Sequence, residues 1–312
     1  MPRVSVSDYS FPGGWSDPTA AGERVRFYCG QLEEGKILDF PAPPFEFPAA
    51  DREFLLSQKQ SGLRVHKNVS YRPRQDVLRG DAADNPDDLR RLHDVMRDFS
   101  RHIVEFATRF LAPYAPHWTI DFASYRPVEE QGRDLSLHKR NDLVHVDAFP
   151  TRPTRGGRIL RVFININPTQ PRVWETTAGF ESIVKGFGDD ARLTRLAHSG
   201  RSPARRALRV LSPIFKTIGL KATDASAYDR YMLRLHDHLK ESSDYQQKWE
   251  KTRLEFAPNS VWLVYTDQVP HAVMSGQFAL EQTFIIPIRA MVAPEHSPLR
   301  VLESRYGTPM AV

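Results

Sequence analysis

The strongest limit on the fold comes from the order of strand-like and helical segments along the chain. Strand-like runs occupy residues 119–168 and again 252–288, with the alternation and β-branched content typical of strands. The residues between them, 180–250, carry helical patterns near 189–198, 203–219 and 226–250. Because strands and helices do not alternate one by one, a parallel βαβ sheet is not favoured. We expect a mainly β fold with helices, in which a double-stranded β-helix of the jelly-roll or cupin-like type is interrupted by a helical insertion.

The chain is expected to form one domain, since 312 residues with 40% hydrophobic content allow one large core with insertions. Residues 1–118 are expected to be an N-terminal wrap of loops and short edge strands, with one supporting helix over 87–112 that begins after a capping Asn-Pro-Asp sequence. Residues 119–290 are the expected jelly-roll core, with its insertion at about 180–250. Residues 291–312 are expected to be a loosely attached C-terminal extension.

Two histidines and one aspartate are the candidate metal ligands. His145 and Asp147 are separated by one residue, and residues i and i+2 of an extended segment point to the same side. His271 follows a strand-like run far downstream. Two histidines and one carboxylate on one triangular face are typical of non-heme Fe(II) sites, and they leave the opposite positions open for a co-substrate, oxygen or water. The alternative for His145 and Asp147 is a hydrogen bond at a strand edge.

Charge and cysteine content limit the partners and the compartment. A net charge of +5 is compatible with nucleic acid, an anionic membrane surface or an acidic substrate. The chain has no zinc-finger spacing, RNP-like aromatic motif or heptad repeat, so we do not expect a nucleic-acid partner. The single cysteine, Cys29, is typical of a reducing compartment. We expect a cytoplasmic protein, because neither a signal-peptide pattern nor an apolar run of about eighteen residues occurs.

The strings around the candidate ligands are similar to those of Fe(II)/2-oxoglutarate-dependent dioxygenases. His145-Val146-Asp147 resembles the His-x-Asp motif of that superfamily, and Val269-Pro270-His271 resembles its distal histidine motif. Within the superfamily, the strings at 143–153 and 161–168, extending through 172–175, are similar to those of the Kdo (3-deoxy-D-manno-oct-2-ulosonic acid) hydroxylases. The resemblance covers about residues 119–290.

This resemblance implies a reaction and a set of cofactors. Fe(II) would be held by His145, Asp147 and His271, with 2-oxoglutarate and O2 as co-substrates. The 3-position of Kdo in the inner core of lipopolysaccharide (Kdo-lipid A) would be hydroxylated to give Ko, with succinate and CO2 as co-products. The alternatives are a 2-oxoglutarate-dependent hydroxylase of another small molecule or peptide, a nucleic-acid demethylase of the same fold, and a non-catalytic metal-binding cupin-like module.

The residue that would hold the co-substrate departs from the pattern of the superfamily. Many members place an arginine or lysine shortly after the distal histidine, but positions 281 and 282 are glutamate and glutamine here. Arg161 is the first candidate, because it lies on the polar face of the next strand and a guanidinium pairs bidentately with a carboxylate. Arg126 is the second candidate. Further residues expected to line the cavity, or considered for it, are Arg172, Trp174, Asn165 and Arg289.

The substrate and location are inferred from charge. Kdo carries a carboxylate and lipid A adds phosphates, so an anionic glycolipid would suit a basic mouth. The residues expected to form that mouth are Arg64, Lys67, Arg72, His138, Lys139, Arg140, Arg152 and Arg155. The basic segment 203–221 is either an ordinary core-facing helix or a contact with the inner membrane, which would place the protein peripherally on its cytoplasmic face. The sequence does not show the oligomeric state.

Overall fold

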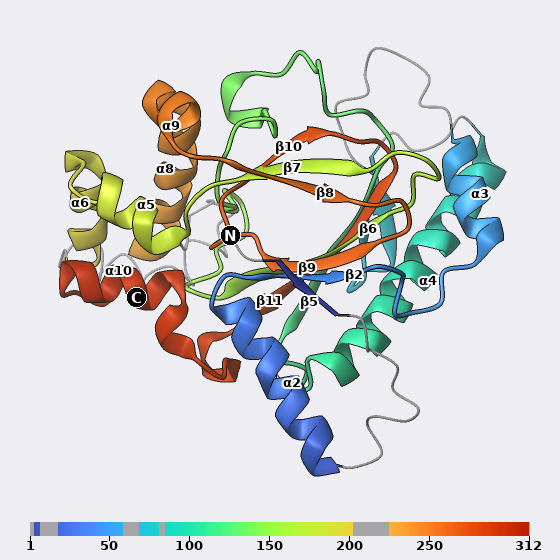
Figure 1. The fold of residues 1–312 in the computed structure, drawn as a ribbon, viewed down its shortest axis with the longest axis horizontal. Coiled ribbons are helices and arrows are strands. Elements are labelled where there is room, and N and C mark those ends of the chain that lie inside the picture. The colour runs from blue at the N-terminus through green and yellow to red at the C-terminus, as the bar shows by residue number, and fades with distance from the viewer. Residues whose placement is uncertain (1–2, 7–17, 59–68, 81–84, 202–224, 312) are drawn as a thin grey trace, which may run out of the picture.

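The computed structural model describes residues 3–6, 18–58, 69–80, 85–201 and 225–311. Its centre is a pair of β-sheets that pack face to face (Figure 1). The strands of the larger sheet are β1 (Arg3–Ser5), β2 (Ile37–Phe40), β3 (Val69–Arg72), β4 (Val77–Arg79), β5 (Thr119–Arg126), β6 (Arg158–Asn165), β9 (Val261–Tyr265) and β11 (Ala279–Ile286). The strands of the smaller sheet are β7 (Arg172–Thr176), β8 (Thr252–Phe256) and β10 (His271–Ser275).

The connectivity confirms the expected double-sheet architecture. The larger sheet has the order β1-β2-β9-β6-β11-β5-β3-β4, and the smaller has the order β10-β7-β8. The strand pairings in both sheets are antiparallel, apart from the parallel β1–β2 pair at one edge of the larger sheet. Strands from before and after the helical insertion alternate in both sheets, so neither block of strands could form its sheet alone.

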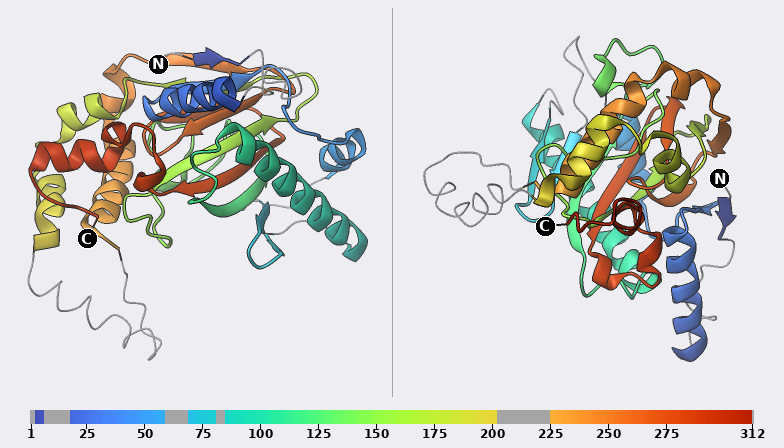
Figure 2. Two further views of the ribbon diagram at one scale, coloured as in Figure 1. Left: turned by 90° about the horizontal axis from the view of Figure 1, so that it is seen from below. Right: turned by 90° about the vertical axis from the view of Figure 1, so that its left-hand side faces the viewer.

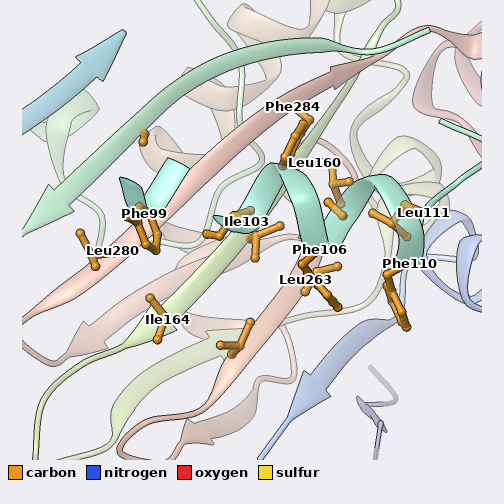
Figure 3. Close-up of a cluster of buried hydrophobic side chains, with 14 of the residues drawn as sticks. Phe99, Ile103, Phe106, Phe110, Leu111, Leu160, Ile164, Leu263, Leu280 and Phe284 are labelled. Carbon is orange, nitrogen blue, oxygen red and sulfur yellow. The ribbon is translucent and has the colours of Figure 1, made fainter. Parts of the chain in front are cut away.

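Strand β6 shows how the sequence alternation divides the two faces of the larger sheet. Leu160, Val162 and Ile164 point into the hydrophobic core beneath the helices (Figure 3). Arg161 and Phe163 lie on the other face, toward the smaller sheet. This is the expected period of two. The space between the sheets therefore has an apolar part, where Phe163 stacks on Trp262, and a polar part that begins at Arg161.

Two long helices cover the outer face of the larger sheet (Figure 2). Helix α4 (Pro86–Phe110) agrees with the sequence prediction, and the side chain of its cap Asn85 accepts a hydrogen bond from the Asp88 backbone N–H at 2.8 Å. Helix α2 (Pro18–Glu33) corrects the expectation that the first fifty residues form only loops and edge strands. Prolines and glycines cluster on both sides of this segment, and they led to a prediction of loops although α2 has an apolar face that it buries.

The remaining helices form a second layer beside the sheets. Helices α5 (Phe180–Phe187), α6 (Ala191–Ala197), α8 (Ala227–Glu241), α9 (Ser243–Lys248) and α10 (Pro298–Tyr306) share a hydrophobic core with the segment around His145. Leu302 and Met310 are fully buried in it, so the C-terminal residues are firmly packed and the expectation of loose attachment is wrong. The segment 203–219 lies outside the described residues. Helix α3 (Ala49–Ser57) and the short 3-10 helices η1 (Leu137–Lys139), η2 (His198–Arg201), η3 (Ile288–Ala290) and η4 (Pro294–His296) complete the described elements.

Candidate metal centre

The two histidines of the predicted triad lie directly opposite each other in the backbone. The His145 N–H donates to the His271 carbonyl at 3.1 Å, and the His271 N–H donates to the His145 carbonyl at 2.9 Å. An antiparallel pair of this kind places both side chains on the same face. The imidazole centroids are 4.8 Å apart as a result. Residues 143–148 are extended as predicted, but they form only this one bridge instead of a regular strand.

Backbone carbonyls fix which ring nitrogen each histidine presents. Nδ1 of His145 lies 2.7 Å from the Leu143 carbonyl, and Nδ1 of His271 lies 2.9 Å from the Val269 carbonyl. A carbonyl can only accept, so Nδ1 carries the proton and Nε2 keeps its lone pair. Burial lowers the pKa of both imidazoles and keeps them neutral. Both rings are therefore held in the form that binds a metal.

Asp147 completes the set from the same segment as His145. Its backbone N–H donates to the Thr266 carbonyl at 2.8 Å, and its Oδ1 lies 3.7 Å from Nε2 of His145. Burial opposes ionisation, but the charge of Arg161, together with the neighbouring His271 and His145 and a hydrogen bond from Thr266, outweighs it and holds the pKa of this carboxyl well below its usual range. One ligand atom each from His145, Asp147 and His271 lie within 4.8 Å of one another. Two neutral imidazoles and one ionised carboxylate fit the donor set of Fe(II).

A pocket of about 690 Å³ opens at this triad, between the two sheets and the helical insertion. Besides the three ligands, its lining includes Arg126, Arg161, Arg172 and Trp174, so four of the five expected co-substrate residues lie together. The volume is in the range of small-molecule sites. The predicted ligands and most of the predicted co-substrate residues thus lie at one pocket.

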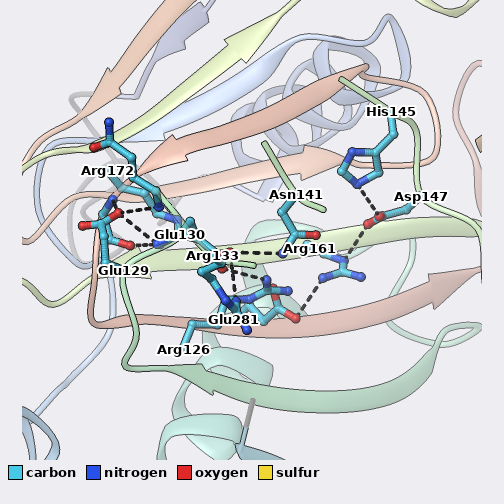
Figure 4. Close-up of polar contacts among 12 residues, drawn as sticks. Arg126, Glu129, Glu130, Arg133, Asn141, His145, Asp147, Arg161, Arg172 and Glu281 are labelled. Atoms are coloured by element: carbon cyan, nitrogen blue, oxygen red, sulfur yellow. Dashed lines mark hydrogen bonds and ion pairs between the residues drawn. The ribbon is translucent and has the colours of Figure 1, made fainter. Parts of the chain in front are cut away.

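Alternating charges connect the metal ligand to the far side of this pocket (Figure 4). Nε of Arg161 is 3.1 Å from Oδ2 of Asp147, and its Nη1 is 2.8 Å from Oε1 of Glu281. Arg126 pairs with the other oxygen of Glu281 at 2.8 Å and approaches Glu130 at 3.8 Å. This network explains the departure at position 281. A glutamate at that position holds two arginines that reach the pocket from β5 and β6.

Arg172 and Trp174 form the wall contributed by the smaller sheet. The Trp174 indole stacks on the His271 ring, with centroids 4.9 Å apart and planes 22° apart. Nη1 of Arg172 donates to the Gly276 carbonyl at 2.9 Å, and its Nη2 is 3.7 Å from Glu130. Burial lowers the pKa of Arg172 to about 10, which still leaves it charged. Arg172 is the least compensated arginine of the pocket lining: its nearest carboxylate is 3.7 Å away, whereas Arg126, Arg133 and Arg161 each have one within 3.0 Å.

Two of the considered residues do not reach the pocket. The Asn165 amide nitrogen donates to the carbonyls of Gln170 at 2.9 Å and Phe256 at 3.1 Å, so it closes the turn after β6. This geometry corrects the expectation that Asn165 binds the co-substrate. Arg289 is exposed on η3, beyond the end of β11.

Sequence reasoning missed two side chains that enter the pocket from helix α8. Nδ1 of His236 donates to the Val146 carbonyl at 2.8 Å, and its ring meets the edge of the His145 ring at 4.9 Å. Lys240 follows one turn later and also lines the pocket. Their i, i+4 spacing was a visible signal in the sequence. The sequence did not show that α8 packs against residues 144–146, and this packing decides that the helix face with His236 and Lys240 points into the pocket.

A buried ion pair supports the turn that leads into His271. Arg158 is fully buried, with Nε 2.8 Å from Oδ2 of Asp267 and its guanidinium over the Tyr265 ring at 4.0 Å. We expect Arg158→Met to lower the free energy of unfolding by about 3–5 kcal/mol, because Asp267 stays buried without its partner. Urea denaturation measures this loss. The double variant Arg158→Met/Asp267→Asn should recover part of it, and a single variant within about 1 kcal/mol of the wild type would contradict this role.

The expected basic mouth is only partly present at the pocket. His138 and Lys139 line it, but Arg140 pairs with Asp142 at 2.6 Å and Arg152 pairs with Asp121. Arg72 and Arg155 are not part of the pocket lining: the Arg72 guanidinium is over the Phe122 ring, and the Arg155 backbone N–H donates to Asp229. Arg64 and Lys67 are outside the described residues. In the part of the chain that the structure describes, no helix is long and apolar enough to cross a membrane.

Comparisons with known proteins agree with this geometry. A family model described as 3-deoxy-D-manno-oct-2-ulosonic acid (Kdo) hydroxylase matches residues 16–309. The chain is similar to crystal structures of the Kdo hydroxylase KdoO, a non-heme Fe(II) α-ketoglutarate-dependent dioxygenase. Its cobalt(II) complex shows 34% identity and a TM-score of 0.82, covering 100% of this chain and 98% of that chain. Its complex with α-ketoglutarate and Fe(III) shows 33% identity and a TM-score of 0.81, covering 99% and 97%. No curated protein sequence matches the chain.

Proposed function

The chain belongs to the family of Kdo hydroxylases, and from this we propose that it hydroxylates the 3-position of Kdo in Kdo-lipid A to give Ko. It is an Fe(II)/2-oxoglutarate-dependent dioxygenase with a Kdo-containing substrate. The observation that carries the proposal is the clustering of His145, Asp147 and His271 at a pocket lined by several arginines. A structural metal would not need such a pocket.

The three ligands would hold Fe(II), which together with 2-oxoglutarate and O2 supplies the oxidation of an unactivated C–H bond, with succinate and CO2 as co-products. The protein positions the reactants and excludes water. The hydrogen bonds of both histidines to backbone carbonyls orient the rings before any ligand binds. Trp174 covers one side of His271 and keeps it from solvent. No protein acid or base is assigned to the C–H cleavage.

Arg161 is the proposed partner of the distal carboxylate of 2-oxoglutarate. It is the arginine that contacts the triad directly, through Oδ2 of Asp147. A metal that neutralises Asp147 would leave Arg161 with Glu281 alone, and a guanidinium has five N–H donors to share. Arg126 and Arg172 add positive charge farther along the same pocket. They would favour a dianion such as 2-oxoglutarate.

An assay with purified protein tests the function. We expect succinate to form only with Fe(II), 2-oxoglutarate, O2 and a Kdo-bearing acceptor present together, and one oxygen to be added to Kdo for each succinate. Mass spectrometry of both products measures this ratio. Succinate formation stimulated by another small molecule or peptide, and not by Kdo, would indicate a different hydroxylase. Metal binding without any succinate would indicate a binding module.

The cytoplasmic location and the peripheral contact with the inner membrane remain part of the proposal. The charge of the basic segment 203–221 supports such a contact; the whole of that segment lies outside the described residues. A substrate anchored by lipid A would also be met at a membrane face. Flotation with anionic vesicles, comparing the wild type with a charge-reversed 205–209 segment, measures it.

A further inference from the structure

One wall of the metal pocket comes from the helical insertion and not from the sheets. Helix α8 contributes His236 and Lys240, and the neighbouring η1 contributes His138 and Lys139. Two contacts hold η1 against α8: Nζ of Lys240 donates to the His138 carbonyl at 3.0 Å, and Nε2 of His138 lies 3.0 Å from Oε1 of Glu241. The residues of this helical wall are different from those of the arginine network on the sheets.

Lys240 is a buried cation that forms no ion pair with the carboxylates of the described residues. The residue is only 4% exposed, yet among the described residues no carboxylate oxygen lies within 4.0 Å of its ammonium. An ammonium has three donors, and the hydrogen bond to the His138 carbonyl uses one. Burial lowers the pKa of Lys240 to about 8, so it is still mostly protonated at neutral pH. A buried charge without a partner is costly, which favours an anionic ligand at this position.

The arginines of the pocket differ from Lys240 in this respect. Arg161 and Arg126 both pair with Glu281, and Arg126 and Arg172 both approach Glu130. They lie on the side where the co-substrate is proposed to bind. Lys240 instead lies on α8, four residues after His236, whose ring contacts His145. The pocket thus has a positive residue on its helical wall, in addition to the arginines on β5, β6 and β7.

The chemistry of Kdo matches a cation at this position. In a 3-deoxy-oct-2-ulosonic acid, the carboxylate is C1, the anomeric carbon is C2 and the methylene is C3. The carbon to be oxidised is therefore only two bonds from the carboxylate carbon. When C3 lies at the metal, the carboxylate must lie within a few ångströms of the triad, where an ammonium can pair with it.

We propose that Lys240 binds the carboxylate of the Kdo residue that is oxidised and thereby places its C3 methylene at the metal. This inference rests on the proposed function and deepens it. It makes helix α8 the part of the chain that selects 2-keto-3-deoxy sugar acids over neutral sugars. His236 supports the same face of α8 through its hydrogen bond to the Val146 carbonyl.

The test compares a Kdo-bearing acceptor with the same acceptor in which the carboxylate is converted to its amide. We expect wild-type kcat/KM to fall about 10- to 100-fold on the amide, since a hydrogen bond to a charged group is lost. Lys240→Met keeps the aliphatic stem and removes the charge. This variant should lose a similar factor on the acid and should hardly distinguish acid from amide.

Two further variants serve as controls. Lys248→Met removes a lysine on α9 whose side chain is 70% exposed, and it should keep the wild-type discrimination. Lys240→Arg keeps the charge and should retain most of the discrimination between acid and amide. Calorimetry with Kdo and metal-free protein gives a readout that does not depend on turnover. We expect Kdo binding to weaken in Lys240→Met while the dissociation constant of 2-oxoglutarate in the metal-loaded protein is unchanged.

Each other outcome has a definite meaning. If Lys240→Met still prefers the acid by the wild-type factor, Lys240 does not bind the carboxylate and the inference is overturned. If 2-oxoglutarate binding weakens and the acid-to-amide ratio is unchanged, Lys240 belongs to the co-substrate site and the inference is likewise wrong. A wild-type protein that oxidises no Kdo acceptor would instead refute the proposed function itself.

Discussion

Asp147→Ala is expected to abolish succinate formation and to weaken metal binding by more than about 100-fold, beyond the effect of losing an outer-shell partner. Among the described residues, Asp147 supplies the carboxylate that lies within 4.8 Å of both histidine ligands. Without it, two neutral imidazoles would face a dication in a buried site where Arg161 remains nearby. The positive charges would then repel the metal. Titration with cobalt(II), followed by visible absorption, measures the affinity.

A matched aspartate in the same segment provides the control for this experiment. Asp142 is paired with Arg140 at 2.6 Å, and its side chain is one-third exposed. Asp142→Ala should bind cobalt(II) like the wild type. If Asp147→Ala also binds with wild-type affinity, the assignment of Asp147 as a ligand is wrong. His145→Ala and His271→Ala should behave like Asp147→Ala.

Arg161→Ala is expected to raise the dissociation constant of 2-oxoglutarate by about 30-fold or more, because truncating one partner of a buried charge pair costs about 2–5 kcal/mol. The variant should keep its metal site, since Asp147 and both histidines remain. Isothermal titration with 2-oxoglutarate, in the presence of a redox-inert metal, separates the two effects. Arg161→Lys should recover only part of the affinity, since an ammonium cannot form the bidentate pair of a guanidinium.

The neighbouring arginine makes this prediction specific. Arg126 lies on β5 and shares Glu281 with Arg161, but it does not contact the triad. Arg126→Met should therefore weaken 2-oxoglutarate binding less than Arg161→Ala does. If the order is reversed, Arg126, the second candidate from the sequence, holds the distal carboxylate. If neither variant changes the affinity, Arg172 and Arg133 are the other arginines of the described pocket lining that could hold the carboxylate.

The clustering of the three candidate ligands could be predicted because it depends largely on local geometry. The spacing of His145 and Asp147 in an extended segment fixes the side to which both point, and alternation along β6 fixes the side of Arg161. His271 required a further inference, from its position after a strand-like run. Its backbone pairing with His145 is a tertiary contact that the structure revealed.

The parts that sequence reasoning missed depend on packing between distant elements. Lys240 and His236 reach the pocket only because α8 packs against residues 144–146, a contact between segments about ninety residues apart. From the sequence, Glu281 stood where many members of the superfamily have a basic residue, and no cation was evident there. The structure shows that Arg126 and Arg161 both pair with Glu281. Helix α2 was hidden because flanking prolines and glycines dominated the local pattern. Pattern reading detects an amphipathic face but not the surface that the face will meet.

The most direct test of the function is a mass comparison of lipopolysaccharide from cells that express the wild-type chain and from cells that express His145→Ala. The hydroxylase assignment predicts that the wild type adds one oxygen to Kdo and that His145→Ala adds none. Fragmentation should place that oxygen on C3. Lipopolysaccharide with identical Kdo masses in both strains, from cells that contain equal amounts of folded protein, would contradict the assignment.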